Sequence, residues 1–173
     1  MDLKSGYPWW AVRNGLIHAF PPLQQDLRCD VLVVGGGITG ALIADELSRH
    51  GQDVAVIEQR DIGWGSTAAS TALLQYEIDT HLLELTQRYG HDAAAAAYLA
   101  CAEAIPALGE VAHGLKDVDF QRMDSLYLAS RTRDVPRLMA EGDARRSIGL
   151  DARWLGPDAL RERFDVAGGG ALL

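Results

Sequence analysis

The sequence contains few cysteines, and it lacks the spacings that mark metal sites and hydrolytic centres. Only Cys29 and Cys101 occur, without a CxxC motif or the framework of a small secreted protein. We expect both to be reduced, buried thiols. The five histidines also lack metal-ligand spacing, and no GxSxG motif or Cys/His pair is present. The sequence therefore predicts no metal site and no hydrolase.

Clusters of basic residues are also missing. The formal net charge is −8 and the sequence pI is near 5.0. Nucleic-acid binding requires grouped lysine and arginine, so we expect no nucleic-acid partner. The arginines between residues 131 and 146 are expected to form a solvated face, and their spacing does not indicate a clamp for a substrate carboxylate. This group consists of Arg131, Arg133, Arg137, Arg145 and Arg146.

Long hydrophobic runs are absent as well. The longest is the alanine-rich Ala93–Ala102, which is shorter than the roughly 20 residues of a membrane-spanning helix. Residues 1–11 do not have the apolar core of a signal peptide. We therefore expect no transmembrane segment and a cytoplasmic location.

The composition is that of a soluble globular protein, with 173 residues, 48% hydrophobic and 23% charged. Residues 1–28 are rich in proline and aromatic side chains and predict an irregular N-terminal arm. We expect this arm to pack along the body of the protein through its rings. These rings belong to Tyr7, Trp9, Trp10 and Phe20.

A βαβ unit is predicted directly after the arm. Val31–Val34 is an apolar, β-branched run of the kind found in strands that are buried on both faces of a parallel sheet. A helix should follow from about Ile38 to His50 and end at Gly51. Residues 53–58 contain a second apolar strand. We therefore predict an α/β fold with a Rossmann-like unit within residues 29–78.

The turn between the first strand and the helix carries a GxGxxG motif formed by Gly35, Gly37 and Gly40. The first glycine permits a tight turn, the second lets a pyrophosphate approach the backbone, and the third allows the helix to pack closely. The amide groups of Ile38 and Thr39 begin the helix and face such an anion. Glu58 follows Gly40 by 18 residues. Its carboxylate can accept hydrogen bonds from both ribose hydroxyls and would repel a 2′-phosphate, so the unit predicts a dinucleotide other than NADP.

The loop after Glu58 is rich in small and hydroxylated residues. Gly65–Thr71 reads GSTAAST, and its amide and hydroxyl groups can reach a phosphate or a ribityl chain. A solvent-facing Ser/Thr loop is the alternative. The fingerprint by itself does not distinguish FAD from NAD.

Residues 29–75 resemble the N-terminal part of the D-amino acid oxidase (DAO) family of FAD-dependent oxidoreductases. The matching text is CDVLVVGGGITGALIADELSRHGQDVAVIEQRDIGWGSTAAST. The resemblance implies FAD as cofactor and hydride transfer to the flavin from a C–H bond beside an amine or hydroxyl of a small substrate. It places Glu58 on the adenosine ribose and the hydroxylated loop along the pyrophosphate. The full predicted cofactor-binding set is Gly35, Gly37, Ile38, Thr39, Gly40, Glu58, Gln59, Arg60, Gly65, Ser66, Thr67, Ser70 and Thr71.

Flavin-dependent glycerol-3-phosphate dehydrogenases resemble this loop, but they usually carry a basic residue at the position of Ala72 and a histidine at that of Gln75. Both departures argue against that substrate. Two further alternatives stay open: an NAD-binding dehydrogenase or sensor, and a piece of a protein that retains no cofactor. No catalytic residue and no oligomeric state are predicted.

Residues 79–173 are predicted as a helical region followed by the start of a substrate domain. Helices are expected from Thr80 to Tyr89, from Asp92 to His113 with a kink or break at Pro106, and from Asp134 to just before Gly149. A short helix opens at Gly156-Pro157, and residues 120–130 alternate like a strand. A doubly wound domain needs more parallel strands than two, so we expect the chain to be part of a longer protein.

Overall fold

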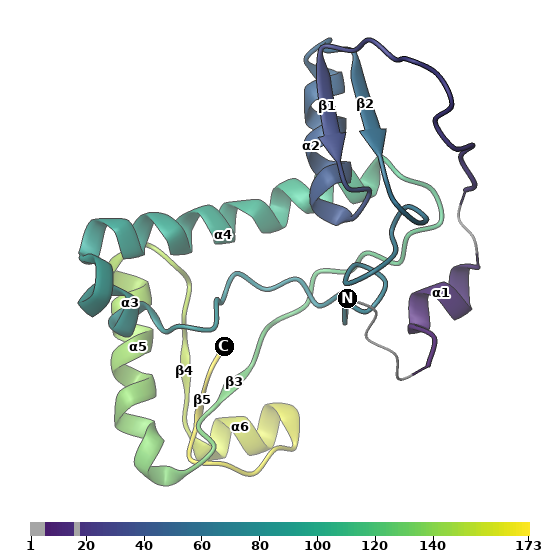
Figure 1. The fold of residues 1–173 in the computed structure, drawn as a ribbon. Helices are drawn as coiled ribbons and strands as arrows, with labels where there is room; N and C mark the ends of the chain where they lie inside the picture. The colour runs from purple at the N-terminus through teal and green to yellow at the C-terminus, as the bar shows by residue number, and fades with distance from the viewer. Residues whose placement is uncertain (1–5, 16–17) are drawn as a thin grey trace. The chain divides into compact units, whose positions relative to one another are not determined.

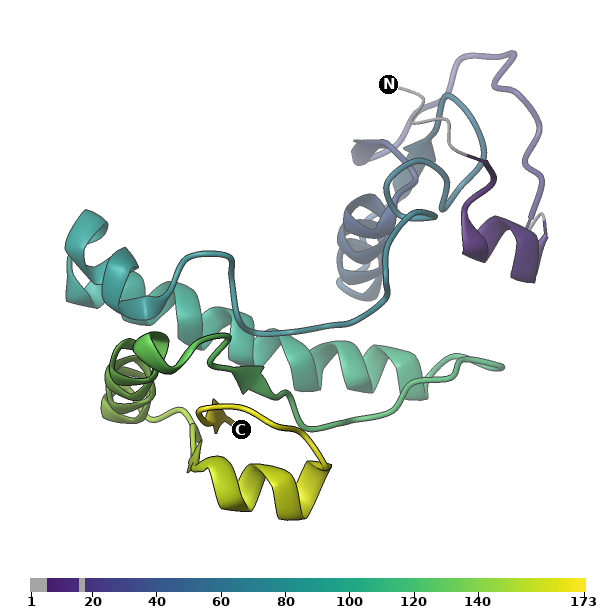
Figure 2. The same ribbon diagram turned by 90° about the horizontal axis from the view of Figure 1, so that it is seen from below.

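The computed structural model describes residues 6–15 and 18–173. The chain forms two compact units, Met1–Leu73 and Leu74–Leu173. Figures 1 and 2 show the elements of each unit from two directions. The sequence places the end of the cofactor-binding segment at residue 78, slightly later than this division. That assignment of roles to segments stays a prediction.

The first unit contains the predicted βαβ arrangement. Strand β1 (Val31–Val34) pairs in parallel with β2 (Val54–Ile57), so that Val31 lies opposite Val54 and Val34 opposite Ile57. Helix α2 (Ile38–Arg49) connects them, and Gly51 leaves it with a φ of 78°. The left-handed conformation explains glycine at this position. The Rossmann-like fold expected from the sequence is confirmed (Figure 1).

Strand β1 is not buried on both faces in this unit, contrary to the prediction. Val33 faces α2, because its Cγ1 lies 3.3 Å from the position that a Cβ on Gly40 would take. Leu32 and Val34 point to the other side and are 52% and 77% exposed. Among the described residues of Met1–Leu73, no helix or strand covers that face. A continuous apolar run therefore correctly predicted a parallel strand but not its surroundings.

In the part of the N-terminal arm that the structure describes, residues 6–15 and 18–28, the short helix α1 (Trp9–Asn14) is the one regular element. Three of the arm's rings remain in solvent, with Tyr7 80%, Trp9 65% and Phe20 65% exposed. Trp10 is the exception, since its indole Nε1–H donates to the backbone oxygen of Ser70 at 2.8 Å. The expected packing through aromatic side chains is thus found at Trp10 and is wrong for the other three.

The second unit combines helices with a small antiparallel sheet. The helices are α3 (Leu82–Tyr89), α4 (His91–His113), α5 (Val135–Ser147) and α6 (Pro157–Phe164), with a 3₁₀ turn at Thr132–Asp134. Strand β5 (Ala171–Leu172) lies between β3 (Tyr127–Leu128) and β4 (Trp154–Leu155). Two small apolar clusters stabilise the unit. They contain Leu82, Ala94 and Tyr98, and Ala129, Leu138 and Leu172.

The helices of this unit were predicted well and its strands poorly. The strand expected over residues 120–130 contracts to Tyr127–Leu128, and β4 and β5 were not predicted. A strand of two residues is too short to show a periodicity in the sequence. Its pairing partners are also distant along the chain, so no local signal marks it. The apolar residues Ala171 and Leu172 are buried as the central strand. Helix α4 continues through Pro106, which lies on its exposed side, so the expected interruption is absent.

Helix α4 also qualifies the expectation of no transmembrane segment. With 23 residues it is long and apolar enough to be a candidate span by length and composition, and 17% of its apolar window is buried in the structure. The sequence prediction considered only the shorter run Ala93–Ala102. A core helix can have the same properties, so this is weak evidence for a membrane location.

Arg145 is not part of a solvated face, which corrects the sequence prediction. It is 1% exposed, and its Nε donates to Glu141 Oε1 at 2.8 Å. Its Nη1 donates to Glu77 and to the Tyr76 hydroxyl, each at 3.3 Å. Helical spacing indicated neighbouring arginines, but could not indicate which of them turns inward to meet a carboxylate from another element.

Candidate cofactor-binding site

The turn between β1 and α2 depends on two glycines. Gly35 has a φ of 113°, which favours glycine, and its amide donates to the oxygen of Ile57 at 2.8 Å. A Cβ on Gly40 would overlap the carbonyl oxygen of Gly35. The start of α2 can therefore approach the end of β1 only because residue 40 has no side chain. These are the roles that the motif predicts for its first and third glycines.

Glu58 is tied to the same turn through its carboxylate. Oε2 accepts the amide of Gly36 at 2.7 Å and Oε1 accepts that of Arg60 at 3.0 Å. The hydrogen bond from Gly36 is the largest cause of a pKa below the usual glutamate value, and the bond from Arg60 adds to it. Each carboxylate oxygen keeps a second lone pair for a hydroxyl donor. Glu58 is therefore held as an ionised acceptor beside the fingerprint.

Gly36 was missed by the sequence prediction. It occupies a variable position of the motif, and it contributes through its backbone. It is buried, and a Cβ there would lie 3.1 Å from Ile62 Cγ2 and 3.3 Å from Glu58 Cβ. The GxGxxG motif leaves this position open to any residue type. A residue that acts through its backbone amide is therefore not marked by the motif. The sequence offers one signal, which is a glycine at the second position of the motif together with the acidic Glu58 after the second strand.

The hydroxylated loop lies against the fingerprint. Thr67 Oγ1 accepts the amide of Ile38 at 3.0 Å, and the amide of Gly63 donates to the oxygen of Gly36 at 2.8 Å. A Cβ on Gly37 would lie 3.0 Å from Thr67 Oγ1. The space beside the second glycine, which the motif assigns to a pyrophosphate, is thus bordered by the Thr67 hydroxyl.

Within the described parts of the chain, the other residues predicted to bind the cofactor have no hydrogen bond to the glycine turn through their side chains. Ser70 Oγ accepts the amide of Ala72 at 3.1 Å and Thr71 Oγ1 that of Leu73 at 3.5 Å, so these hydroxyls bond within the loop. Three of the other predicted residues are exposed and one is partly buried. Thr39, Gln59 and Ser66 are exposed, and Gly65 is partly buried near the Arg60 guanidinium.

This arrangement fits the ADP half of a dinucleotide. The first amides of a helix have no intrahelical acceptor, and that of Ile38 is already used by Thr67. The amides of Thr39 and Gly40 are left for a diphosphate, where the helix dipole also favours negative charge. The Glu58 carboxylate has further lone pairs that can accept hydroxyl donors of the kind a ribose carries. Among the described residues, no group of three or more His, Cys, Asp or Glu side chains could hold a metal ion.

Comparison with known proteins agrees with this geometry. Residues 30–173 match the family described as FAD dependent oxidoreductase (DAO). A protein of Bacillus subtilis (strain 168), named as a putative Rieske 2Fe-2S iron-sulfur protein, is 31% identical over 144 residues, which is 83% of this chain. Gamma-glutamylputrescine oxidoreductase of Escherichia coli (strain K12) is 39% identical over 88 residues, or 50% of this chain.

Among solved structures, glycine oxidase from Geobacillus kaustophilus matches 84% of this chain with a TM-score of 0.60 and 22% identity. That likeness shows the fold. The matched segments are 28% of the Bacillus protein, 20% of the E. coli protein and 39% of the glycine oxidase chain. The chain thus spans well under half the length of these proteins.

Proposed function

The chain belongs to the FAD dependent oxidoreductase (DAO) family, and we propose that its first unit holds the ADP half of FAD in an enzyme that oxidises a small amine or amino acid. The observation that carries the proposal is the pairing of Glu58 with the amide of Gly36 at 2.7 Å. It holds an ionised carboxylate beside a glycine turn in which Gly36 and Gly40 leave little space for a side chain. A cytoplasmic location remains part of the proposal.

FAD, when bound, would supply the redox chemistry by accepting a hydride from a substrate C–H bond. The residues of this chain would bind and orient it. Glu58 would accept the ribose hydroxyls, with Gln59 and Arg60 beside it. The amides of Thr39 and Gly40 would hold the diphosphate. The hydroxyl-rich loop would continue from there toward the flavin, through the groups of Gly65, Ser66, Thr67, Ser70 and Thr71.

An amine substrate is favoured by one relative and by two departures from the glycerol-3-phosphate dehydrogenase pattern. The E. coli relative, 39% identical over 88 residues, is named for a putrescine derivative, which is an amine. The positions that usually hold a basic residue and a histidine in glycerol-3-phosphate dehydrogenases are Ala72 and Gln75 here. Ala72 and Gln75 lack the positive charge and the imidazole that those dehydrogenases carry, and this argues against a phosphorylated alcohol as substrate.

An NAD-binding dehydrogenase or sensor is the second candidate. It would use the same βαβ unit and the same acidic residue after β2. The hydroxylated loop distinguishes the two, because an NAD site does not need it, whereas here Thr67 bonds to the start of α2. We therefore prefer FAD.

Anaerobic reduction of the bound flavin tests the substrate class. The whole protein, purified with FAD, should lose its visible flavin absorption when mixed with primary or secondary amines such as putrescine derivatives or N-methylamino acids. Glycerol 3-phosphate should leave the spectrum unchanged. Bleaching by glycerol 3-phosphate and by none of the amines would overturn the proposed substrate class.

A further inference from the structure

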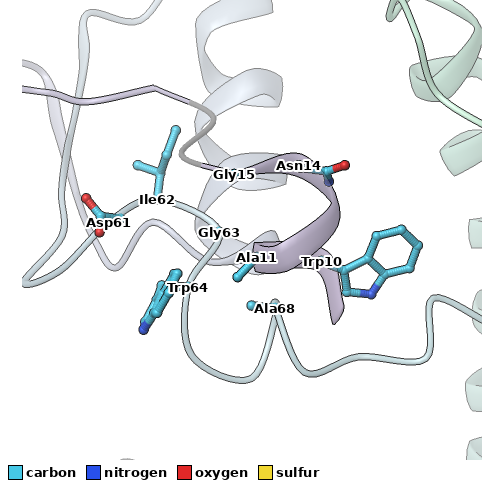
Figure 3. Close-up of a pocket in the computed structure, with 9 residues that line it drawn as sticks. All are labelled: Trp10, Ala11, Asn14, Gly15, Asp61, Ile62, Gly63, Trp64 and Ala68. Carbon is cyan, nitrogen blue, oxygen red and sulfur yellow. The ribbon is translucent and has the colours of Figure 1, made fainter. Parts of the chain in front are cut away.

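The N-terminal arm contacts the hydroxylated loop, and the proposed function gives this contact no role. Trp10 of α1 donates its indole Nε1–H to the oxygen of Ser70 at 2.8 Å, across 60 positions of the sequence. Ala68 lies nearby and is 5% exposed. Figure 3 shows α1 beside the loop, with Ala11 and Ala68 on the facing sides.

The space between the arm and the loop is small. It is a cavity of about 40 Å³, which has room for a few water molecules but not for a substrate. Its walls come from the arm on one side and from the loop on the other (Figure 3). The lining residues are Trp10, Ala11, Asn14 and Gly15, and Asp61, Ile62, Gly63, Trp64 and Ala68. The arm therefore packs against the loop and does not enclose a ligand site with it.

The opposite side of the loop is bound to the fingerprint. The amide of Gly63 donates to Gly36, and Thr67 accepts the amide of Ile38. From Ser66 onward the loop is held by short turns, such as the bond from the amide of Ala69 to the oxygen of Ser66 at 3.2 Å. Bonds within a turn do not fix its position on the rest of the molecule. The hydrogen bond from Trp10 to Ser70 joins the far end of the loop, beyond Thr67, to a segment that is distant in sequence.

We propose that Trp10 is a positioning residue for the FAD-binding loop. By holding the backbone of Ser70, it keeps the segment from Ser66 to Thr71 ordered before the cofactor arrives. A loop that is already ordered loses less conformational entropy on binding, so the affinity rises without any new contact to the ligand. The inference rests on the proposed function, because it assigns FAD to this loop.

The test uses the whole protein and compares Trp10→Phe and Trp10→Ala with the matched control Trp9→Phe. Trp9 lies on the same short helix and is 65% exposed. The first measurement is amide hydrogen exchange of residues 61–71 in the apo-protein. Exchange should be faster in Trp10→Phe, which lacks the indole donor, faster still in Trp10→Ala, and unchanged in Trp9→Phe.

The second measurement is the FAD dissociation constant, obtained from the quenching of flavin fluorescence. Loss of one neutral hydrogen bond should raise it about two- to tenfold in Trp10→Phe, with a larger rise in Trp10→Ala. Faster loop exchange with unchanged FAD affinity would overturn the positioning role, as would unchanged exchange. Normal FAD binding by the parent protein with no effect in either variant would reject this inference and leave the proposed function intact. Parent protein that binds NAD in place of FAD would reject both.

Discussion

At the scale of single residues, the candidate site depends on atoms that are absent. Gly40 has no Cβ, and this lets the first turn of α2 lie against the carbonyl of Gly35. Gly36 has no Cβ, and this lets Ile62 and Glu58 close over it. What remains at the surface of the turn is backbone, and backbone amides are suited to a diphosphate.

Gly40→Ala should therefore destabilise the turn. The added methyl group would overlap the Gly35 oxygen, and α2 would have to move away from β1. Overpacking of this kind costs about 1–3 kcal/mol, and we expect the FAD affinity to fall as well. Urea unfolding of the whole protein would measure the loss. Ala41→Ser, at the exposed next position, is the control and should have little effect. Equal stability of Gly40→Ala and the parent would show that the close approach is not needed.

The charge of Glu58 gives a prediction about pH. Its pKa is lowered in the folded protein, first by the hydrogen bond from Gly36 and then by that from Arg60. A depressed folded pKa means that the contribution of the carboxylate is present above the ordinary glutamate pKa. It is lost only as the pH falls through the lower folded value.

The FAD dissociation constant of the parent protein, relative to that of Glu58→Gln, should therefore stay constant from neutral pH down to the ordinary glutamate range. Below that range the difference between the two proteins should shrink. Fluorescence titrations at a series of pH values would check this. A difference that already disappears near pH 6 would indicate a pKa raised above the ordinary glutamate value and contradict the hydrogen-bonded geometry.

At the scale of elements, the second unit is held together by a buried ionic network. Glu141 of α5 accepts the amides of Leu82 and Leu83 at 2.8 and 3.1 Å, so it caps the N-terminus of α3. The same carboxylate pairs with Arg145 at 2.8 Å. Burial opposes ionisation of Glu141, but the bonds from Arg145 and from the two amides outweigh it and lower its pKa. Burial likewise disfavours the charge on Arg145, and the bond to Glu141 more than offsets this and raises its pKa.

Breaking this pair should be costly. Arg145→Leu leaves the Glu141 carboxylate buried without its partner, and Glu141→Gln leaves Arg145 without its nearest counter-charge. Removal of one member of a buried pair typically costs about 3–5 kcal/mol. Urea unfolding would measure the change, with Arg137→Leu as control, because Arg137 is 67% exposed in its pair with Glu84. A cost below that of the control would show that the network is not important for stability.

Prediction from the sequence succeeded where local signals are strong. The glycine turn, the two valine-rich strands and the long helices each have a signature within about ten residues of chain, and all were located. The missed features depend on contacts between distant positions. Strand β5 forms by pairing Leu172 with Tyr127 on one side and with Trp154 on the other. Arg145 points inward because it bonds to Glu77 and Glu141. Nothing near these residues in the sequence indicates such partners.

At the candidate cofactor-binding site, too, the contacts between residues distant in sequence could not be predicted. Glu58 was predicted as a ribose ligand from its spacing to Gly40, and in the structure its carboxylate accepts the amide of Gly36 in the fingerprint. Its role toward the ribose stays a prediction. The hydrogen bond between Thr67 and Ile38, and that between Trp10 and Ser70, join segments 29 and 60 positions apart. Composition indicated that the loop could contact a phosphate, but it could not show which hydroxyl reaches the helix or that the arm holds the loop.

At the scale of the whole molecule, the two units differ in what they contribute. The first carries the fingerprint, Glu58 and the loop, and it is the part on which the cofactor proposal rests. The second has its own apolar clusters and ionic network. The family match extends over both, from residue 30 to residue 173. A substrate-binding role for the second unit stays a prediction.

Titration of the whole apo-protein with FAD tests the central claim most directly. The parent protein should bind one FAD per chain, and Glu58→Arg should bind it at least tenfold more weakly, because a cation would face the ribose hydroxyls in place of an acceptor. NAD should not compete at equal concentration. Failure of the parent protein to bind FAD, or an unchanged affinity in Glu58→Arg, would contradict the assignment of this turn and this carboxylate to the cofactor.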